Sequence, residues 1–254
     1  MISGGETRML SERKRVMQRF YDSAAPGYVR RDEGLKQTFH NGSEFIWLAE
    51  LPLQDQRILD VGTGTGRLFR FVQDRGHQTA LSVGVDLSSQ MLLMARARTG
   101  EHCRTCFVQC DAEALPFNGD SFHLVTCFGL FEYIADLRPF LREFNRVTVP
   151  KGWLLFTCRN IGRLLPFPNR FYPVADHERS AVQKAVQECG YSVLRHKTIY
   201  HLNGRWIWAL TSACERLGCD AALLRFVMAI NRALRNSPVF GTGGKTHLVL
   251  AQRS

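Results

Sequence analysis

Short apolar runs alternate with amphipathic segments through the middle of the chain. Runs of strand length occur at 57–61, 80–85, 106–110, 124–128 and 153–157, and helical patterns occur at 68–75, 89–98 and 137–147. In the last of these, Phe140, Leu141 and Phe144 fall on one helical face. Strands that alternate with helices predict an α/β fold built on a doubly wound, mostly parallel sheet.

The two ends of the chain have a different pattern. The C-terminal part predicts a helix at 179–188, a strand at 191–200, helical stretches at 205–217 and 221–235, and a last strand at 247–251. The expected sheet therefore has seven strands, with a helical insertion at 205–235 before the last one. Residues 1–50 are expected to be helical, with a break at Ala25-Pro26-Gly27, and residues 51–254 to form the α/β domain.

Composition narrows the class of protein without identifying it. The chain has 254 residues, of which 45% are hydrophobic and 22% charged, as in ordinary globular proteins. No apolar run reaches the roughly 18–20 residues of a membrane-spanning helix. The first residues, MISGGETRMLSERKR, lack the apolar segment of a signal peptide. We therefore expect a cytoplasmic protein.

Positive charge collects near the C-terminus of a chain whose net charge is +10. An anionic acceptor, a membrane surface or nucleic acid would each explain this, as would a solvated basic surface without a partner. In the 221–235 stretch, Phe226, Val227 and Ile230 share an apolar stripe, while Arg225 and Arg232 lie off it. The stretch fits either a helix that caps the sheet or a basic amphipathic surface that roofs an apolar pocket and touches anionic lipid.

Three of the eight cysteines are close together, at Cys103, Cys106 and Cys110. A structural zinc site usually needs a second pair of ligands, and none is evident at a suitable spacing. Thiols in a strand also serve as small apolar residues. The sequence therefore predicts no metal site.

A strand that runs into alternate glycines is the strongest sequence signal. Gly62, Gly64 and Gly66 follow the first strand, and glycine lets a ligand approach the backbone closely. A dinucleotide fingerprint would need a third glycine where Arg67 stands, and the Lys-Ser/Thr end of a P-loop is absent. A ligand without a pyrophosphate suits this loop better.

Acidic residues end the next two strands. Asp86 is placed to accept the hydroxyls of a ribose, although it could instead cap the helix that follows. Asp111 ends the third strand. Because the carboxyl ends of parallel strands lie at one edge of the sheet, these residues and the glycine loop should line a single crevice.

Five segments occur in an order typical of one enzyme superfamily. They are ILDVGTGTGRL (58–68), VGVDLSSQML (83–92), FVQCDAEALPFNGDSFHLVTCFGLFEYIAD (107–136), LREFNRVTVPKGWLLFT (141–157) and ECGY (188–191). Together they resemble class I S-adenosylmethionine-dependent methyltransferases, and are most similar to the ubiquinone/menaquinone-biosynthesis type that acts on small molecules. The resemblance implies a Rossmann-like fold, S-adenosyl-L-methionine as cofactor and S-adenosyl-L-homocysteine as product.

The resemblance also implies roles for individual residues. The loop would hold the methionine end of the cofactor, the acids its ribose and adenine, and a tyrosine of an N-terminal lid (residues 1–50) would cover it. The implied contacts are Tyr28, Asp60, Gly62, Thr63, Gly64, Gly66, Asp86, Leu87, Met91, Asp111, Ala112, Cys127 and Phe128. Phe128 could equally pack in the core, and Tyr28 could equally anchor a helix to the domain.

The sequence does not identify a catalytic base with the same clarity. Methyl transfer is an in-line displacement, and a base is required only where the acceptor must lose a proton. Candidates are His40, His177, His201, Tyr133 and Glu132, each of which also fits a structural or surface role. We favour His177, because the loop after the fifth strand would overhang an acceptor pocket.

The predicted function is methyl transfer to oxygen or carbon of a small or lipid-like acceptor. One alternative is a nucleic-acid (RNA) methyltransferase, which the charge suggests. The loop Cys127-Phe128-Gly129-Leu130 lacks the Asn/Asp-Pro-Pro-aromatic motif of enzymes that methylate exocyclic base nitrogens. A second alternative is a non-catalytic partner protein that only binds S-adenosylmethionine.

Overall fold

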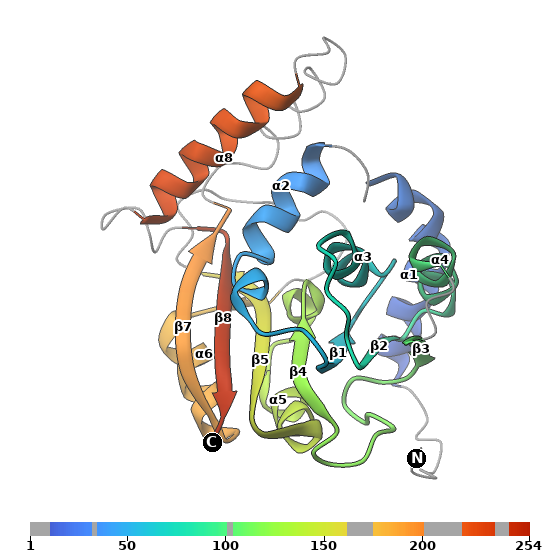
Figure 1. Cartoon of the computed structure of the whole chain (residues 1–254). Helices are drawn as coiled ribbons and strands as arrows, with labels where there is room; N and C mark the ends of the chain where they lie inside the picture. The colour runs from blue at the N-terminus through green and yellow to red at the C-terminus, as the bar shows by residue number, and fades with distance from the viewer. Residues whose placement is uncertain (1–10, 32–34, 101–103, 162–174, 201–219, 237–243) are drawn as a thin grey trace.

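A twisted sheet forms the centre of the molecule (Figure 1). The computed structural model describes residues 11–31, 35–100, 104–161, 175–200, 220–236 and 244–254. The strands are β1 (Arg57–Val61), β2 (Leu81–Asp86), β3 (Thr105–Gln109), β4 (Phe122–Cys127), β5 (Thr148–Asn160), β6 (Asp176–His177), β7 (Tyr191–Ile199) and β8 (Thr246–Arg253). They are ordered β3-β2-β1-β4-β5-β8-β7, and β6 pairs with β5 off this path.

The strand directions confirm the predicted doubly wound, mostly parallel sheet. β1 to β5 run parallel to one another, and β8 is antiparallel to both β5 and β7. The chain builds outward from β1 to β3, then returns to place β4 on the other side of β1. A reversal of this kind opens a crevice at the carboxyl ends of β1 and β4.

Helices cover both faces of the sheet, as the continuous apolar character of its strands requires. The α-helices are α1 (Glu12–Arg31), α2 (Leu35–Glu44), α3 (Arg67–Asp74), α4 (Ser89–Thr99), α5 (Arg138–Val147), α6 (Arg179–Glu188) and α8 (Asp220–Asn236). Short 3-10 helices are η1 (Leu48–Glu50) and η2 (Leu130–Tyr133). In Figure 1, α2 and α8 lie at the carboxyl ends of the parallel strands.

Alternate residues of each strand enter opposite halves of the core. Leu59 and Val125 pack on one face with α5 and α6, whereas Ile58 and Leu124 pack on the other with α3 and α4. Both halves are closed to solvent, so a one-residue slip of any central strand would exchange its two sets of side chains. This constraint fixes where each strand ends, and therefore where Asp86 stands.

The N-terminal helix corrects one prediction. α1 continues through Ala25-Pro26-Gly27, where the sequence predicted a break. Proline removes one helical hydrogen bond, but α1 packs along α4 and Ala25 is fully buried. Packing thus outweighs the local preference for a break. The division of the chain at residue 50 stays a prediction.

The predicted insertion is described only in its second half. The stretch 205–217 lies outside the described residues, while α8 confirms the helix expected at 221–235. In α8, Val227 is buried and Met228 reaches the space beside Gly42 of α2, but Phe226 is 61% exposed. Among the described helices, none has both the length and the apolar character to cross a bilayer. The cytoplasmic location and the contact with anionic membrane stay predictions.

Two glycine substitutions test the packing of the sheet and the continuity of α1. A Cβ at Gly84 would lie 2.8 Å from the Phe107 ring and 2.9 Å from the Phe69 ring, so Gly84→Ala should cost about 1–3 kcal/mol of unfolding free energy. A Cβ at Gly27 would meet no atom within 4 Å, so Gly27→Ala should gain up to about 1 kcal/mol. Denaturant unfolding measures both, and a destabilised Gly27→Ala variant would contradict a continuous α1.

Candidate functional site

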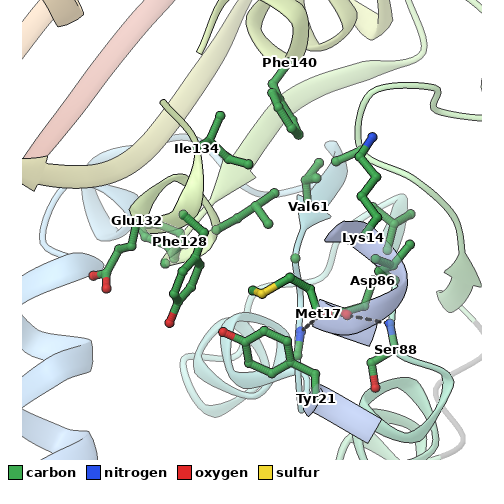
Figure 2. Close-up of a pocket in the computed structure, with 18 of the residues that line it drawn as sticks. Lys14, Met17, Tyr21, Val61, Asp86, Ser88, Phe128, Glu132, Ile134 and Phe140 are labelled. Carbon is green, nitrogen blue, oxygen red and sulfur yellow. Dashed lines mark hydrogen bonds between the residues drawn. The ribbon is translucent and has the colours of Figure 1, made fainter. Parts of the chain in front are cut away.

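A cavity of about 760 Å³ lies at the carboxyl ends of β1, β2 and β4 (Figure 2). This volume is within the range of sites that bind small molecules and cofactors. Its wall includes nine of the residues implied as cofactor contacts: Tyr28, Gly62, Gly64, Asp86, Leu87, Met91, Asp111, Ala112 and Phe128. The other four, Asp60, Thr63, Gly66 and Cys127, do not line it.

The loop after β1 brings its backbone to the cavity. Gly62, Gly64 and Gly66 all have positive φ angles, of 72°, 53° and 76°, in the left-handed region that favours glycine. The N–H of Gly62 donates to the Val85 carbonyl of β2 at 2.8 Å, which holds the turn against the next strand. Gly66 instead packs against α4, where an added Cβ would come within 3.2 Å of Ala95.

Asp86 joins this loop to the start of α4. One carboxylate oxygen accepts the Gly64 N–H at 2.9 Å, and the other accepts the Ser88 N–H at 2.9 Å. The cap of α4 is Ser88, whose hydroxyl oxygen accepts the Met91 N–H. Burial raises the pKa of Asp86, while the N–H groups oppose the shift. Each oxygen keeps a further lone pair for a ligand in the cavity.

Asp60 is buried behind the loop. Its carboxylate accepts the Thr126 hydroxyl of β4 at 2.7 Å, and only 4% of the residue is exposed. Burial raises the pKa of Asp60 to about 6, against the lowering effects of the Thr126 hydrogen bond and the charge of Arg67. Asp60 therefore holds β1 against β4 through this hydrogen bond.

α1 closes the cavity on the side of β3. Lys14 makes ion pairs with Asp111 at 2.6 Å and with Glu113 at 3.0 Å. Asp22 accepts the Ser88 hydroxyl at 2.6 Å. Figure 2 shows Lys14, Met17 and Tyr21 of α1 around the same cavity as Asp86. No sequence motif indicated Lys14, whose partner is far along the chain.

Tyrosine rings continue this wall toward η2. The Tyr21 ring lies 5.9 Å from that of Tyr28 and 6.4 Å from that of Tyr133, centroid to centroid. Burial raises the pKa of Tyr21, which stays protonated near neutral pH. Tyr28 therefore fits both readings of the sequence, since it lines the cavity and also contributes to packing between α1 and the domain.

A buried polar cluster stands at the other end of the cavity. Tyr200 donates a hydrogen bond to Glu44 at 2.6 Å, and Arg67 donates to the same carboxylate at 2.5 Å. His40 lies 3.3 Å from the Tyr200 hydroxyl. Burial alone would raise the pKa of Glu44, but the charges of Arg67 and His40 and the Tyr200 bond hold it below its usual value. Sequence reasoning noted Arg67 only as a departure from a fingerprint and missed Glu44 and Tyr200.

The residues after β4 divide between core and cavity. Phe128 lines the cavity and also packs against Phe45 at a centroid distance of 5.0 Å, so both of its predicted roles fit. Cys127 is fully buried, and burial raises the pKa of its thiol. Its side chain therefore belongs to the core beneath the cavity.

His177, the favoured base, does not line the cavity. It lies in β6 with 9% of its surface exposed, and its backbone carbonyl accepts a hydrogen bond from the His247 ring at 3.1 Å. Burial lowers the pKa of His177, so its ring is neutral near pH 7. The loop before it, 162–174, and another candidate, His201, lie outside the described residues.

In the described part of the chain, no group of three or more metal-ligating side chains comes together. Cys103 is outside that part, Cys106 is exposed and Cys110 is half-buried. Burial raises the pKa of Cys110 to about 12, so its thiol is protonated.

Comparison with known proteins assigns a domain to this geometry. Residues 59–156 match the family described as "Methyltransferase domain". A malonyl-[acyl-carrier protein] O-methyltransferase of Erwinia billingiae is 37% identical over 133 residues, 47% of this chain and 50% of that protein. A demethylmenaquinone methyltransferase of Deinococcus radiodurans is 33% identical over 159 residues, 62% of each chain. The chain thus spans between half and two thirds of these relatives.

Solved structures confirm the fold at lower identity. A methyltransferase from Haloferax volcanii, solved in complex with the Trm112 methyltransferase activator, superposes with a TM-score of 0.65. The sequences are 20% identical, and the match covers 92% of this chain and 97% of that one. This likeness extends the shared architecture beyond the 59–156 segment.

The buried carboxyl of Asp60 predicts a specific pH dependence of stability. Because its pKa is raised to about 6, the folded state binds this proton more tightly than the unfolded state does. The resulting stabilisation is complete below the ordinary pKa and is lost as the pH rises through about 6. Between about pH 4 and pH 7, the unfolding free energy of the wild type should fall by up to about 3 kcal/mol relative to Asp60→Asn.

Denaturant titrations of both proteins across this pH range measure the difference. Other titrating groups contribute equally to the two proteins and cancel. Parallel curves of stability against pH would show that Asp60 titrates normally in the folded chain.

Proposed function

Residues 59–156 match a methyltransferase domain, and from this premise we propose that the chain transfers a methyl group from S-adenosylmethionine to oxygen or carbon of a small or lipid-like acceptor. The observation that supports this most is the shape of the site. One end of the cavity presents the glycine loop and Asp86, and the other presents a separate polar and aromatic wall.

The residues present fit the cofactor. Asp86 has lone pairs left for a ribose diol after its two backbone bonds, and Asp111 offers a carboxylate to the adenine amino group. A Cβ at Gly64 would meet no protein atom within 4 Å, so the backbone there faces open space. Leu87 and Met91 supply an apolar surface beside the adenine position.

The protein's contribution to the reaction is alignment and exclusion of water. When bound, S-adenosylmethionine supplies an activated methyl carbon and a good leaving group. The glycine loop and Asp86 position S-adenosylmethionine, while Phe128 and Glu132 form the wall of the cavity that the methyl acceptor meets. Such positioning can lower a barrier by about 7–11 kcal/mol. The Tyr21 and Tyr28 rings of α1 line the cavity and shield the space where the two reactants would meet from solvent.

The enclosed wall favours a small acceptor over a polynucleotide. Single-stranded nucleic acid is typically held in a basic groove with exposed aromatic rings. Here Tyr21 and Tyr28 of α1 line the cavity, and their rings pack against one another. Relatives named for malonyl-acyl-carrier-protein and demethylmenaquinone methylation support a small-molecule or lipid-like acceptor.

Product formation from a panel of acceptors tests the proposal. The enzyme is incubated with methyl-labelled S-adenosylmethionine and a malonyl thioester, a reduced naphthoquinone or a short RNA. We expect label in one of the small molecules and none in the RNA. Labelled RNA would favour the nucleic-acid alternative. Tight cofactor binding with no product from a broader set of small acceptors would favour a non-catalytic partner protein.

Loss of the Asp86 carboxylate should weaken cofactor binding. Hydrogen bonds to a charged group contribute about 1.5–3 kcal/mol, so Asp86→Ala should raise the Kd for S-adenosylhomocysteine by about 10- to 150-fold. Asp74→Ala, at the exposed end of α3, serves as the control. Calorimetry measures both, and unchanged affinity in Asp86→Ala would contradict the ribose assignment. NAD should not bind to any of these proteins.

Cofactor should also restrain α1. Because Lys14, Met17, Tyr21 and Tyr28 all line the cavity, a bound ligand adds contacts to this helix. Amide hydrogen exchange across 12–31 should therefore slow when S-adenosylhomocysteine is added. α6 contributes no residue to the cavity wall and is the internal control. Equal exchange of α1 with and without ligand would count against a lid.

A further inference from the structure

Glu132 differs from every other carboxyl that lines the described cavity. The others have partners: Glu44 with Tyr200 and Arg67, Asp86 with Gly64 and Ser88, Asp111 and Glu113 with Lys14, and Asp136 with Arg138. No described residue makes a hydrogen bond to the Glu132 carboxyl. A partly buried polar group without a partner is costly, so among these carboxyls Glu132 is the one most ready to bind a ligand.

The backbone that carries Glu132 is held firmly. It belongs to η2, which follows directly from β4, and its carbonyl accepts the Ala175 N–H at 2.9 Å. Just before η2, the Gly129 N–H donates to the Thr157 hydroxyl at 3.0 Å. Figure 2 shows Glu132 across the cavity from Asp86 and Lys14, on the side of Phe128. It therefore stands at the end where an acceptor would enter the site.

The surroundings make this carboxyl a stronger proton acceptor than an ordinary glutamate. Burial raises the pKa of Glu132, and the carboxylates of Glu44 and Asp176 reinforce the shift. The positive charges of Lys245 and Arg159 oppose it. A base with a pKa closer to the working pH transfers protons more effectively.

Other groups at this end are less suited to accept a proton. Burial raises the pKa of Tyr200, whose hydroxyl already donates to Glu44. Glu44 is neutralised by Arg67 in a 2.5 Å ion pair. His177 does not line the cavity. The geometry thus leaves Glu132 as the carboxyl free to meet an acceptor.

We propose that Glu132 is the catalytic residue that accepts the proton of the methyl acceptor, an inference that rests on the proposed methyl transfer. The O–H or C–H bond of the acceptor breaks, and its proton moves to a carboxylate oxygen of Glu132. The electron pair left on the acceptor forms the bond to the methyl carbon. The bond from that carbon to sulfur breaks, and its electron pair stays on sulfur as a neutral thioether. Glu132 then returns the proton to solvent.

Two substitutions and a matched control separate this role from a structural one. Glu132→Gln removes the basic oxygen while keeping the shape, and Glu132→Asp keeps a carboxylate on a shorter chain. Glu188→Gln, on the surface at the end of α6, is the control. Calorimetry with S-adenosylhomocysteine should give affinities within about threefold of wild type for all three, since Glu132 lies away from the glycine loop and Asp86.

Turnover should respond differently. With the acceptor that the panel identifies, Glu132→Gln should lose kcat by about 10²- to 10⁴-fold, and Glu132→Asp should recover part of it. In the wild type, kcat should rise with pH as Glu132 loses its proton and then level off. This rise of kcat with pH should be absent from the residual activity of Glu132→Gln. A kcat within threefold of wild type, or an unchanged pH profile, would overturn the role of Glu132.

Infrared titration gives a second test that needs no acceptor. Asp60 and Asp86 also have raised pKa values, so the Glu132 signal is the part of the protonated carboxyl band that Glu132→Gln removes. In the complex with S-adenosylhomocysteine, the difference spectrum of wild type minus Glu132→Gln should contain a protonated carboxyl band above the ordinary glutamate pKa. The difference spectrum of wild type minus Glu188→Gln should contain none. Absence of the band from the Glu132→Gln difference spectrum overturns the inference. Failure of the wild type to bind S-adenosylhomocysteine would instead overturn the proposed function itself.

Discussion

The bond between the Gly64 N–H and the Asp86 carboxylate is the contact on which the site depends. It joins the loop after β1 to the end of β2, while the second oxygen of Asp86 holds the Ser88 N–H at the start of α4. Ser88 in turn donates to Asp22 of α1. The Asp86 carboxylate thus positions the loop after β1 and the start of α4. Through one further hydrogen bond, from Ser88 to Asp22, it also positions α1 beside the cavity. A ligand that binds Asp86 would meet a group already oriented by the backbone.

Burial of charge explains how the two ends of the cavity differ. The Asp86 carboxylate is stabilised by local N–H groups, and Glu44 by Arg67 and Tyr200, which are distant in the chain. Glu132 has neither kind of partner among the described residues. A binding site needs satisfied groups to keep its shape, whereas proton transfer needs a group whose two protonation states are close in free energy. Carboxylates with partners stand at both ends of the cavity, Asp86 at one and Glu44 at the other, and Glu132 lies near Glu44 without such a partner among the described residues.

The part of this site that the sequence predicts consists of residues that lie close together along the chain. The β1 loop, Asp86 and Asp111 could be placed from sequence because each lies at or just after the end of a strand, and the carboxyl ends of parallel strands share an edge. The Glu44, Arg67 and Tyr200 cluster could not, because its members come from α2, α3 and the residue after β7, which only tertiary folding brings together. α1 was misjudged for a related reason. Pro26 is a local signal for a break, but contact with α4 is a longer-range effect and prevails.

The two ends of the cavity therefore differ in how they depend on the fold: one is formed by local backbone geometry and the other by tertiary packing. Local backbone geometry fixes the end of the cavity suited to the cofactor, so it can be retained while other parts of the sequence change. The other end of the cavity is lined by residues of η2 and α2 together with Tyr200 and Lys245, which are outside the glycine motif. Changes there alter the polarity and shape offered to an acceptor without disturbing the Gly64–Asp86 bond. On the proposed function, specificity for the acceptor would depend on Glu132 and its neighbours, and the acidity of the acceptor's proton would be the deciding property.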